Sequence, residues 1–118
     1  EHVLSAYDDI THGVGLAIIT HRWMTHVLSE KRVDRFVKYG VMYLELIHQD
    51  PFEITNQAID AIYMFFEFIH IPMHLKEVRI DESRMDEMAK HVAENEGLEN
   101  AWVPLFQKDI ADIFRASL

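Results

Sequence analysis

Apolar residues recur at helical spacing along most of the chain, and no segment shows the alternation typical of a half-buried strand. The densest run follows Thr11, a suitable N-cap residue, and continues to about Ser29 in the segment THGVGLAIITHRWMTHVLS. Because its apolar residues exceed a single stripe, we expect a largely buried helix. A second helix is predicted from about Glu30 to Ile47, with these apolar residues near one face: Val33, Phe36, Val37, Val41, Leu44 and Ile47.

A third helix is predicted from its start and stop signals. Asp50 is an N-cap residue followed by Pro51 at the first helical position, and the helix extends to about Ile69 before Pro72 ends it. It carries aromatic residues on most of its sides. We therefore expect this helix to be central in the fold.

Two more helices follow an extended link. The first is capped by Asp81 or Ser83 and stopped by Gly97, and the second is a short amphipathic helix within the closing segment LFQKDIADIFRASL. Its paired apolar residues are Ile110, Ile113 and Phe114. Without repeats, a low-complexity segment or a strand signal, the pattern predicts one all-α domain over residues 1–118, with about five or six helices.

Glycines and methionines refine the expected packing. Gly13 and Gly15 each cost up to about 1 kcal/mol relative to alanine in a helix interior, so we expect a neighbouring helix or a ligand to approach the backbone there. Five methionines lie at core spacing and are interpreted as apolar filler: Met24, Met42, Met64, Met85 and Met88.

Composition excludes several functional classes. The net charge of −9 argues against nucleic-acid binding, and the basic residues Lys31, Arg32, Arg35 and Lys38 are interpreted as a solvated helix face. The chain has no cysteine, which fits a reducing compartment, and cytoplasm is the expected location. No apolar run reaches the roughly 18 residues that a membrane span needs, and the acidic start does not resemble a signal peptide.

Most of the histidines are interpreted as surface or core residues. A metal site on one helix would show pairs at i,i+3 or i,i+4, and His70 and His74 have that spacing but are separated by Pro72. A polar cap at a helix end is therefore favoured for them. The remaining histidines of this group lack a matching partner: His21, His26, His48 and His91.

His2 and His12 stand in a different setting. His12 begins a buried, glycine-bearing helix that can hold an imidazole rigidly. Two histidines are too few for a catalytic metal site, which ordinarily has three or four protein ligands. Asp8 or Asp9 could orient a ring, although a solvated turn is the favoured interpretation for both.

The segment EHVLSAYDDITHGVGLAIITHRWM resembles the metal-site segment of the iron-containing (group III) alcohol dehydrogenases, closest to the bacterial butanol dehydrogenase branch. That segment reads approximately H-x-x-x-H-x-L-(S/G/T)-A, then about eight residues, then H-G-x-x-x-A. Here His2 occupies the second histidine of HxxxH, His12 and Gly13 form the HG pair, and Ala17 completes the pattern. The stretches FFEFIHIPMHLKEVRIDESRMDEMAKHVAE and VPLFQKDIADIFRASL are also similar to the family, so the resemblance covers nearly the whole chain.

This resemblance implies a dehydroquinate synthase-like C-terminal helical domain and assigns roles to two residues. His12 would be a metal ligand, with the other ligands expected upstream of Glu1, and His2 would be a proton-relay histidine near substrate and nicotinamide. The implied cofactors are a divalent metal, with Fe²⁺ favoured over Zn²⁺ or Ni²⁺, and NAD(P), which would bind mainly to an N-terminal α/β domain that this chain lacks. Other implied partners are a small alcohol or aldehyde and further copies of the chain.

Two expectations accompany this interpretation, and two rival interpretations stand beside it. The chain alone should be inactive as an alcohol dehydrogenase or aldehyde reductase, and it should expose an apolar patch around Val14 to Ile19 or self-associate. A free-standing acidic helical interaction module explains the composition equally well, but it does not explain the glycines after His12. A complete metal-binding bundle would need acid and histidine ligands in register on facing helices, and the sequence shows no such set.

Overall fold

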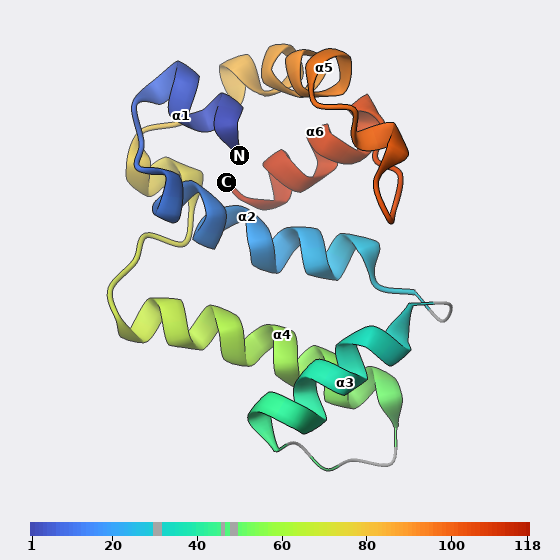
Figure 1. Ribbon diagram of the computed structural model, residues 1–118. Helices are drawn as coiled ribbons and strands as arrows, with labels where there is room; N and C mark the ends of the chain where they lie inside the picture. The colour runs from blue at the N-terminus through green and yellow to red at the C-terminus, as the bar shows by residue number, and fades with distance from the viewer. Residues whose placement is uncertain (30–31, 46, 48–49) are drawn as a thin grey trace.

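The computed structural model describes residues 1–29, 32–45, 47 and 50–118. Within these residues, all the regular secondary structure is helical. The predicted all-α fold is confirmed, and six α-helices lie within these residues (Figure 1). They are α1 (His2–Asp8), α2 (His12–Val27), α3 (Val33–Leu44), α4 (Pro51–Phe68), α5 (Met85–Asn95) and α6 (Gln107–Ala116). Short 3₁₀ helices cover Leu75–Val78, Glu82–Arg84 and Leu98–Asn100.

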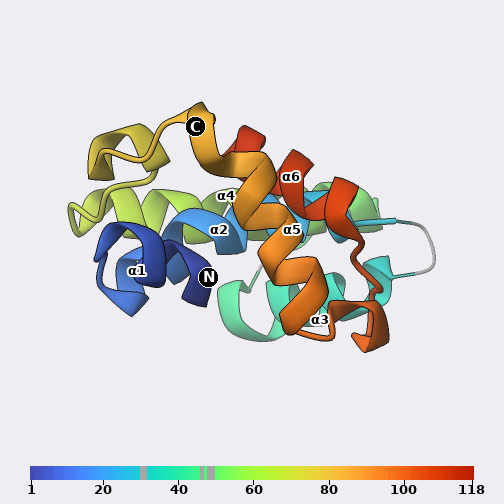
Figure 2. The ribbon, with the colours of Figure 1, turned by 90° about the horizontal axis from the view of Figure 1, so that it is seen from above.

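The main core lies between α2 and the helices α1, α5 and α6. Leu4, Ile18, Met85 and Met88 are each 0% exposed in this core. Figure 2 shows α1 beside α2 at one end of the molecule and α5 running over α6. The backbone N–H of Leu75 donates to the Ser117 carbonyl at 2.8 Å, which ties the link before α5 to the end of α6. The helix α1 packs against both α2 and α5, with Val3 and Leu4 buried.

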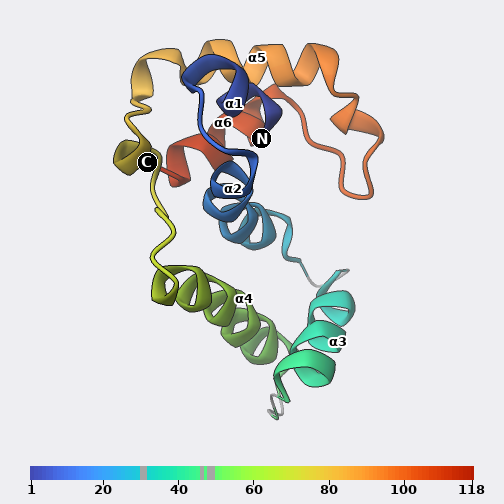
Figure 3. The ribbon, with the colours of Figure 1, turned by 60° about the vertical axis from the view of Figure 1, so that its left-hand side comes forward.

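The helices α3 and α4 form a separate pair on the other face of α2 (Figure 3). Gly40 of α3 faces α4, where an added Cβ would lie 2.7 Å from Cγ2 of Ile54. Ile54, Ala58 and Ile59 are buried on the inner side of α4. The helix is thus a peripheral layer with one buried side.

The prediction that α4 is central is wrong. Its other side is exposed, with Met64, Phe65 and Phe68 at 65%, 57% and 79% exposure. When a helix has few neighbours, one of its sides stays exposed even if it is rich in aromatic residues. The sequence does not show how many neighbours a helix will have. We call the exposed apolar residues of α3, of α4 and of the C-cap position after α4 the outer α3–α4 surface: Val41, Met42, Met64, Phe65, Phe68 and Ile69.

The prediction that the methionines are apolar filler holds at some positions and fails at others. Met85 and Met88 are buried core residues, and Met24 packs partly buried against the core, as predicted. Met42 and Met64 are exposed, so the filler interpretation is wrong for them. These two lie on the outer α3–α4 surface, where no described residue covers them.

The expected apolar patch between Val14 and Ile19 is not formed. Ala17 and Ile18 are buried, while Val14 and Ile19 pack partly buried against the core. Leu16, at 43% exposure, is the exposed large apolar residue of this segment. The packing of α1, α5 and α6 against α2 accounts for the difference.

Helix ends follow the predicted signals closely. The Asp50 carboxylate accepts a hydrogen bond from the Phe52 N–H at 2.9 Å, and Pro51 begins α4. Asp81 accepts from the Ser83 N–H at 2.8 Å and so caps the 3₁₀ turn before α5. Gly97 follows α5 with a φ of 63°, a conformation that favours glycine.

Other boundaries differ from prediction. The helix α3 ends at Leu44, and Ile47 beyond it is 95% exposed. The predicted start at Glu30 and the basic residue Lys31 lie outside the described residues. The seven-residue helix α1 was not predicted. No helix of the described residues combines the length and hydropathy that crossing a bilayer requires.

Candidate metal centre

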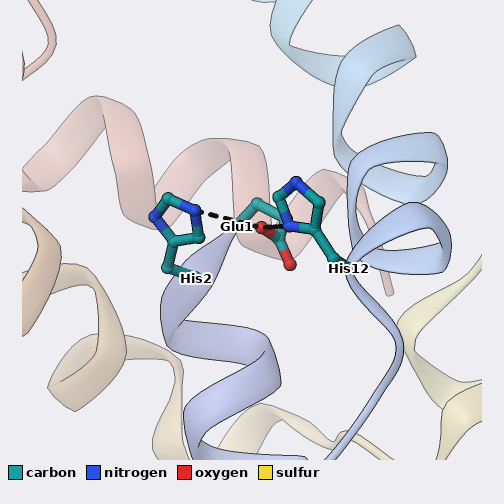
Figure 4. A group of neighbouring side chains, drawn as sticks. All are labelled: Glu1, His2 and His12. Carbon is teal, nitrogen blue, oxygen red and sulfur yellow. Dashed lines mark ion pairs between the residues drawn. The ribbon is translucent and has the colours of Figure 1, made fainter.

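A tight turn brings His2 and His12 together. Asp9 adopts a left-handed conformation with φ 52°, and its N–H donates to the Ser5 carbonyl at 3.2 Å, which ends α1. The chain then reverses, and α2 begins at His12 after Thr11 in the N-cap position. His2 and His12 are each the first residue of a helix, and their rings stack with centroids 5.4 Å apart and planes 12° from parallel (Figure 4).

The carboxylate of Glu1 lies between the two rings. Its Oε2 atom lies against Nδ1 of His12 and 3.9 Å from Nε2 of His2 (Figure 4). Its Oε1 atom accepts a hydrogen bond from Oγ of Ser5 at 2.7 Å. The Glu1 side chain is only 7% exposed, whereas those of His2 and His12 are 74% and 59% exposed. A buried carboxylate thus faces two accessible imidazoles.

Gly15 leaves the space that the carboxylate occupies. A Cβ at this position would lie 2.9 Å from Oε1 of Glu1 and 3.1 Å from its Cγ. The predicted close approach is therefore confirmed at Gly15, and the approaching group is a side chain of the same protein. At Gly13 an added Cβ would meet nothing within 4 Å, so no described residue approaches the backbone there, and approach by a ligand stays a prediction.

The donor set suits a divalent metal. One ligand atom each from Glu1, His2 and His12 can be chosen so that all lie within 4.8 Å of one another. Imidazole and carboxylate donors together suit Fe²⁺ and Zn²⁺. Oε2 of Glu1 is buried, and apart from its ion pairs with the His2 and His12 rings it has no polar partner among the described residues. Within the described part of the chain this is the one group of three or more such residues close enough to share an ion.

Sequence reasoning missed Glu1 and considered two other acids. Asp8 instead pairs with Arg84, and Asp9 is exposed in the turn. The signal that could have identified Glu1 is its spacing from Ser5, because residues i and i+4 share a helix face. Its contact with His12 depends on the turn at Asp9 and carries no local signal.

His70 and His74 do not form a metal site with a third ligand among the described residues. His70 is exposed with a φ of 61° just after α4. His74 precedes the 3₁₀ helix Leu75–Val78, where its N–H donates to Oε1 of Glu77 at 2.9 Å. Its Nδ1 lies 3.5 Å from Nη2 of the buried Arg22. The predicted role at a helix end is confirmed for His74.

Each of the remaining described histidines has a different neighbour. His21 lies over Tyr63 with ring centroids 5.0 Å apart, and burial, aided by the charge of Arg22, lowers the pKa of His21. Nε2 of His26 is 3.3 Å from Oδ1 of Asp109. The His91 ring packs edge-on to that of Tyr7 at 6.2 Å. His48 lies outside the described residues.

Comparison with known proteins identifies the family. Residues 1–118 match the family described as "Fe-containing alcohol dehydrogenase family, C-terminal". The chain belongs to the iron-containing alcohol dehydrogenase family. Among its relatives, it is 39% identical over 119 residues to the NADH-dependent butanol dehydrogenase A of Clostridium acetobutylicum, covering 99% of this chain and 31% of that protein. Identity to the probable NADH-dependent butanol dehydrogenase 1 of Bacillus subtilis is 31% over 119 residues, covering 100% of this chain and 30% of that protein.

Solved structures of this iron-containing alcohol dehydrogenase family agree with the fold. A 1,3-propanediol oxidoreductase superposes with a TM-score of 0.86 at 26% identity, over 99% of this chain and 31% of the other. An NADH-dependent butanol dehydrogenase A from Thermotoga maritima superposes with a TM-score of 0.84 at 24% identity, over 98% and 31%. The chain therefore spans about a third of the length of the relatives that it matches.

Proposed function

We propose that the chain is the C-terminal helical domain of a metal- and NAD(P)-dependent alcohol dehydrogenase that exchanges hydride between nicotinamide and a primary alcohol or aldehyde. The observation that carries the proposal is that His2 and His12, at the starts of α1 and α2, lie together in a chain that matches the iron-containing family from residue 1 to 118. The names of its Clostridium and Bacillus relatives support NADH and a short alcohol as the reactants.

His12 is the proposed metal ligand in this domain. Its Nδ1 faces Glu1, so Nε2 is the nitrogen left to hold the metal. Fe²⁺ is the favoured ion, and the same donors accept Zn²⁺ or Ni²⁺. When bound, the metal supplies Lewis-acid polarisation of the substrate oxygen.

His2 is the proposed proton carrier. Its ring is 74% exposed and stacks on that of His12, so one nitrogen can meet solvent while the ring stays beside the metal ligand. An imidazole nitrogen can both accept and donate a proton, which suits transfer of the alcohol proton.

The nicotinamide cofactor is proposed to bind mainly to an N-terminal α/β domain. The described residues are helical, and dinucleotides are ordinarily bound by a βαβ unit. The active protein would then consist of both domains, act on a small alcohol or aldehyde, assemble as a homo-oligomer and reside in the cytoplasm. The 118 residues alone would be inactive.

A chimera tests the proposal. The 118 residues replace the segment of Clostridium acetobutylicum butanol dehydrogenase A that they match, and butanal reduction is measured by NADH oxidation with and without added Fe²⁺ or Zn²⁺. We expect metal-dependent turnover that His12→Ala abolishes. His26→Ala is the matched control, because it removes another histidine at the opposite end of α2. A soluble, folded chimera that binds NADH but shows no metal-dependent turnover would refute the proposal.

Calorimetric titration of the 118-residue chain with Zn²⁺ adds a separate check. Weak binding that His12→Ala removes is expected of a site whose remaining ligands lie elsewhere. Tight stoichiometric binding would mean that Glu1, His2 and His12 complete a metal site by themselves. That result would mean that the 118 residues form a complete metal-binding module, and not part of a site whose other ligands lie elsewhere.

A further inference from the structure

We propose that Glu1 is a positioning residue that selects the tautomer and the orientation of the His12 ring. This inference rests on the proposed role of His12 as a metal ligand and adds a residue that the sequence did not indicate. It depends on three features of the described structure: how the Glu1 carboxylate is held, which nitrogen it faces, and why Gly15 is a glycine.

The Glu1 carboxylate is held from two sides. Oγ of Ser5 donates to Oε1 at 2.7 Å within α1, and the backbone of Gly15 in α2 lies against the same oxygen. With only 7% of the side chain exposed, the carboxylate has little freedom to move to another partner. It is a preset acceptor between two helices.

The free oxygen of this carboxylate faces one nitrogen of His12. Oε2 lies against Nδ1, while the second ring nitrogen points away from Glu1 (Figure 4). A carboxylate favours the tautomer in which Nδ1 carries the proton, since Nδ1–H can then donate to it. The lone pair is left on Nε2, as a neutral imidazole ligand requires.

The neighbouring acid Glu96 provides a natural contrast. Its Oε2 atom lies 3.9 Å from Nδ1 of His2, which is too long for a hydrogen bond, and its side chain is 41% exposed. The structure places it near His2 and gives it no contact with His12. Only Glu1 among these two carboxylates is both buried and directed at the proposed ligand.

Gly15 is the partner that makes this arrangement sterically possible. Alanine at this position would bring Cβ to 2.9 Å from Oε1, so the carboxylate would have to shift. Alanine at Gly13, in the same turn of α2, would meet nothing within 4 Å. The two glycines form a matched pair in which one substitution displaces Glu1 and the other does not.

The test is a nitrogen-15 NMR measurement of the histidine rings in the metal-free 118-residue chain, at about pH 8, where imidazoles are ordinarily neutral. The ring-nitrogen shifts report which nitrogen carries the proton. In the unsubstituted chain His12 should be mainly Nδ1–H. Glu1→Ala and Gly15→Ala should each lower the ratio of Nδ1–H to Nε2–H about tenfold, because a hydrogen bond to a charged group contributes at least one such factor. Glu96→Ala and Gly13→Ala should leave the ratio unchanged.

Several outcomes would overturn the inference. An Nε2–H tautomer at His12 in the unsubstituted chain would do so, as would an unchanged ratio in Glu1→Ala. Loss of Zn²⁺ binding in Glu1→Ala with an unchanged tautomer would identify Glu1 as a direct ligand instead. If circular dichroism shows that Glu1→Ala does not fold, the comparison of Gly15→Ala with Gly13→Ala decides the question, since both keep the carboxylate.

The result is separable from that of the proposed function. The tautomer measurement uses no metal and no cofactor, whereas the chimera reports metal-dependent turnover. A Glu1-dependent tautomer beside an inactive, folded chimera would leave the positioning role intact and remove the dehydrogenase proposal. Metal-dependent turnover with a tautomer insensitive to Glu1 would do the reverse.

Discussion

Substitution of Gly40 by alanine probes the contact that joins α3 to α4. The new Cβ would lie 2.7 Å from Cγ2 of Ile54 and 3.4 Å from Cβ of Ala58. Carbon atoms in contact ordinarily lie about 3.5–4.0 Å apart, so the first of these is an overlap of roughly 1 Å. Ile54 is buried and β-branched, which restricts its rotation, and the two helices must separate slightly to admit the methyl group.

The expected change is a balance of two opposing effects. Overpacking of this kind costs about 1–3 kcal/mol. Replacing glycine by alanine inside a helix contributes about 1 kcal/mol of stability in return. With a cost in the upper part of the overpacking range, Gly40→Ala should therefore lower the free energy of unfolding by about 1–2 kcal/mol. Gly13→Ala, with nothing near its Cβ, should raise it by up to about 1 kcal/mol.

Urea unfolding followed by circular dichroism measures both variants against the unsubstituted chain. A double-mutant cycle with Ile54→Ala identifies the cause, because that substitution removes the overlapping Cγ2 atom. In the Ile54→Ala background, Gly40→Ala should no longer destabilise. The reasoning fails if Gly40→Ala is as stable as Gly13→Ala, or if its cost persists without the Ile54 side chain.

Three further predictions concern charge and surface. Burial lowers the pKa of His21, so the His21 ring binds a proton less readily in the folded chain than in the unfolded chain. The free energy of unfolding should therefore decrease as the pH falls from about 6.5, the ordinary pKa of histidine, toward the pKa of His21 in the folded chain. His21→Gln should flatten that part of the curve of unfolding free energy against pH. The Phe106 N–H donates to Asp109 at 2.9 Å and lowers its pKa, so Asp109→Ala should cost about 1 kcal/mol at neutral pH, and this contribution should fade in the unsubstituted chain below about pH 4. Phe68→Lys, on the outer α3–α4 surface, should reduce self-association of the chain in analytical ultracentrifugation, and unchanged association would exclude that surface as its cause.

Local signals were sufficient for most of the helices. Residues that begin or end a helix act on backbone groups only a few residues away, so their effect can be predicted from the sequence. The examples here are Asp50 with Pro51, Asp81 with Ser83, and Gly97. The short helix α1 was missed because its apolar pattern spans only seven residues. A helix of that length is marginal alone and depends on packing of Val3 and Leu4 against the core.

The density of apolar residues did not predict correctly which sides of a helix are buried. The aromatic residues of α4 predicted a central position, yet Phe65 and Phe68 are exposed and only its inner side packs. Coverage depends on how many neighbours reach a helix, which is a property of the whole arrangement. The same reason explains why Leu16 is exposed while Ala17 and Ile18 beside it are buried.

The sequence by itself determined the helical class, most helix boundaries and the resemblance that singled out His2 and His12, because all of these follow from residue type and short spacing. Only the tertiary structure decided that Glu1 lies between the two rings and that Gly15 makes room for it. That contact depends on the reversal of the chain at Asp9, which brings the starts of two helices together. Side chains on different helices meet through such turns and through packing, and spacing along one helix carries no record of either.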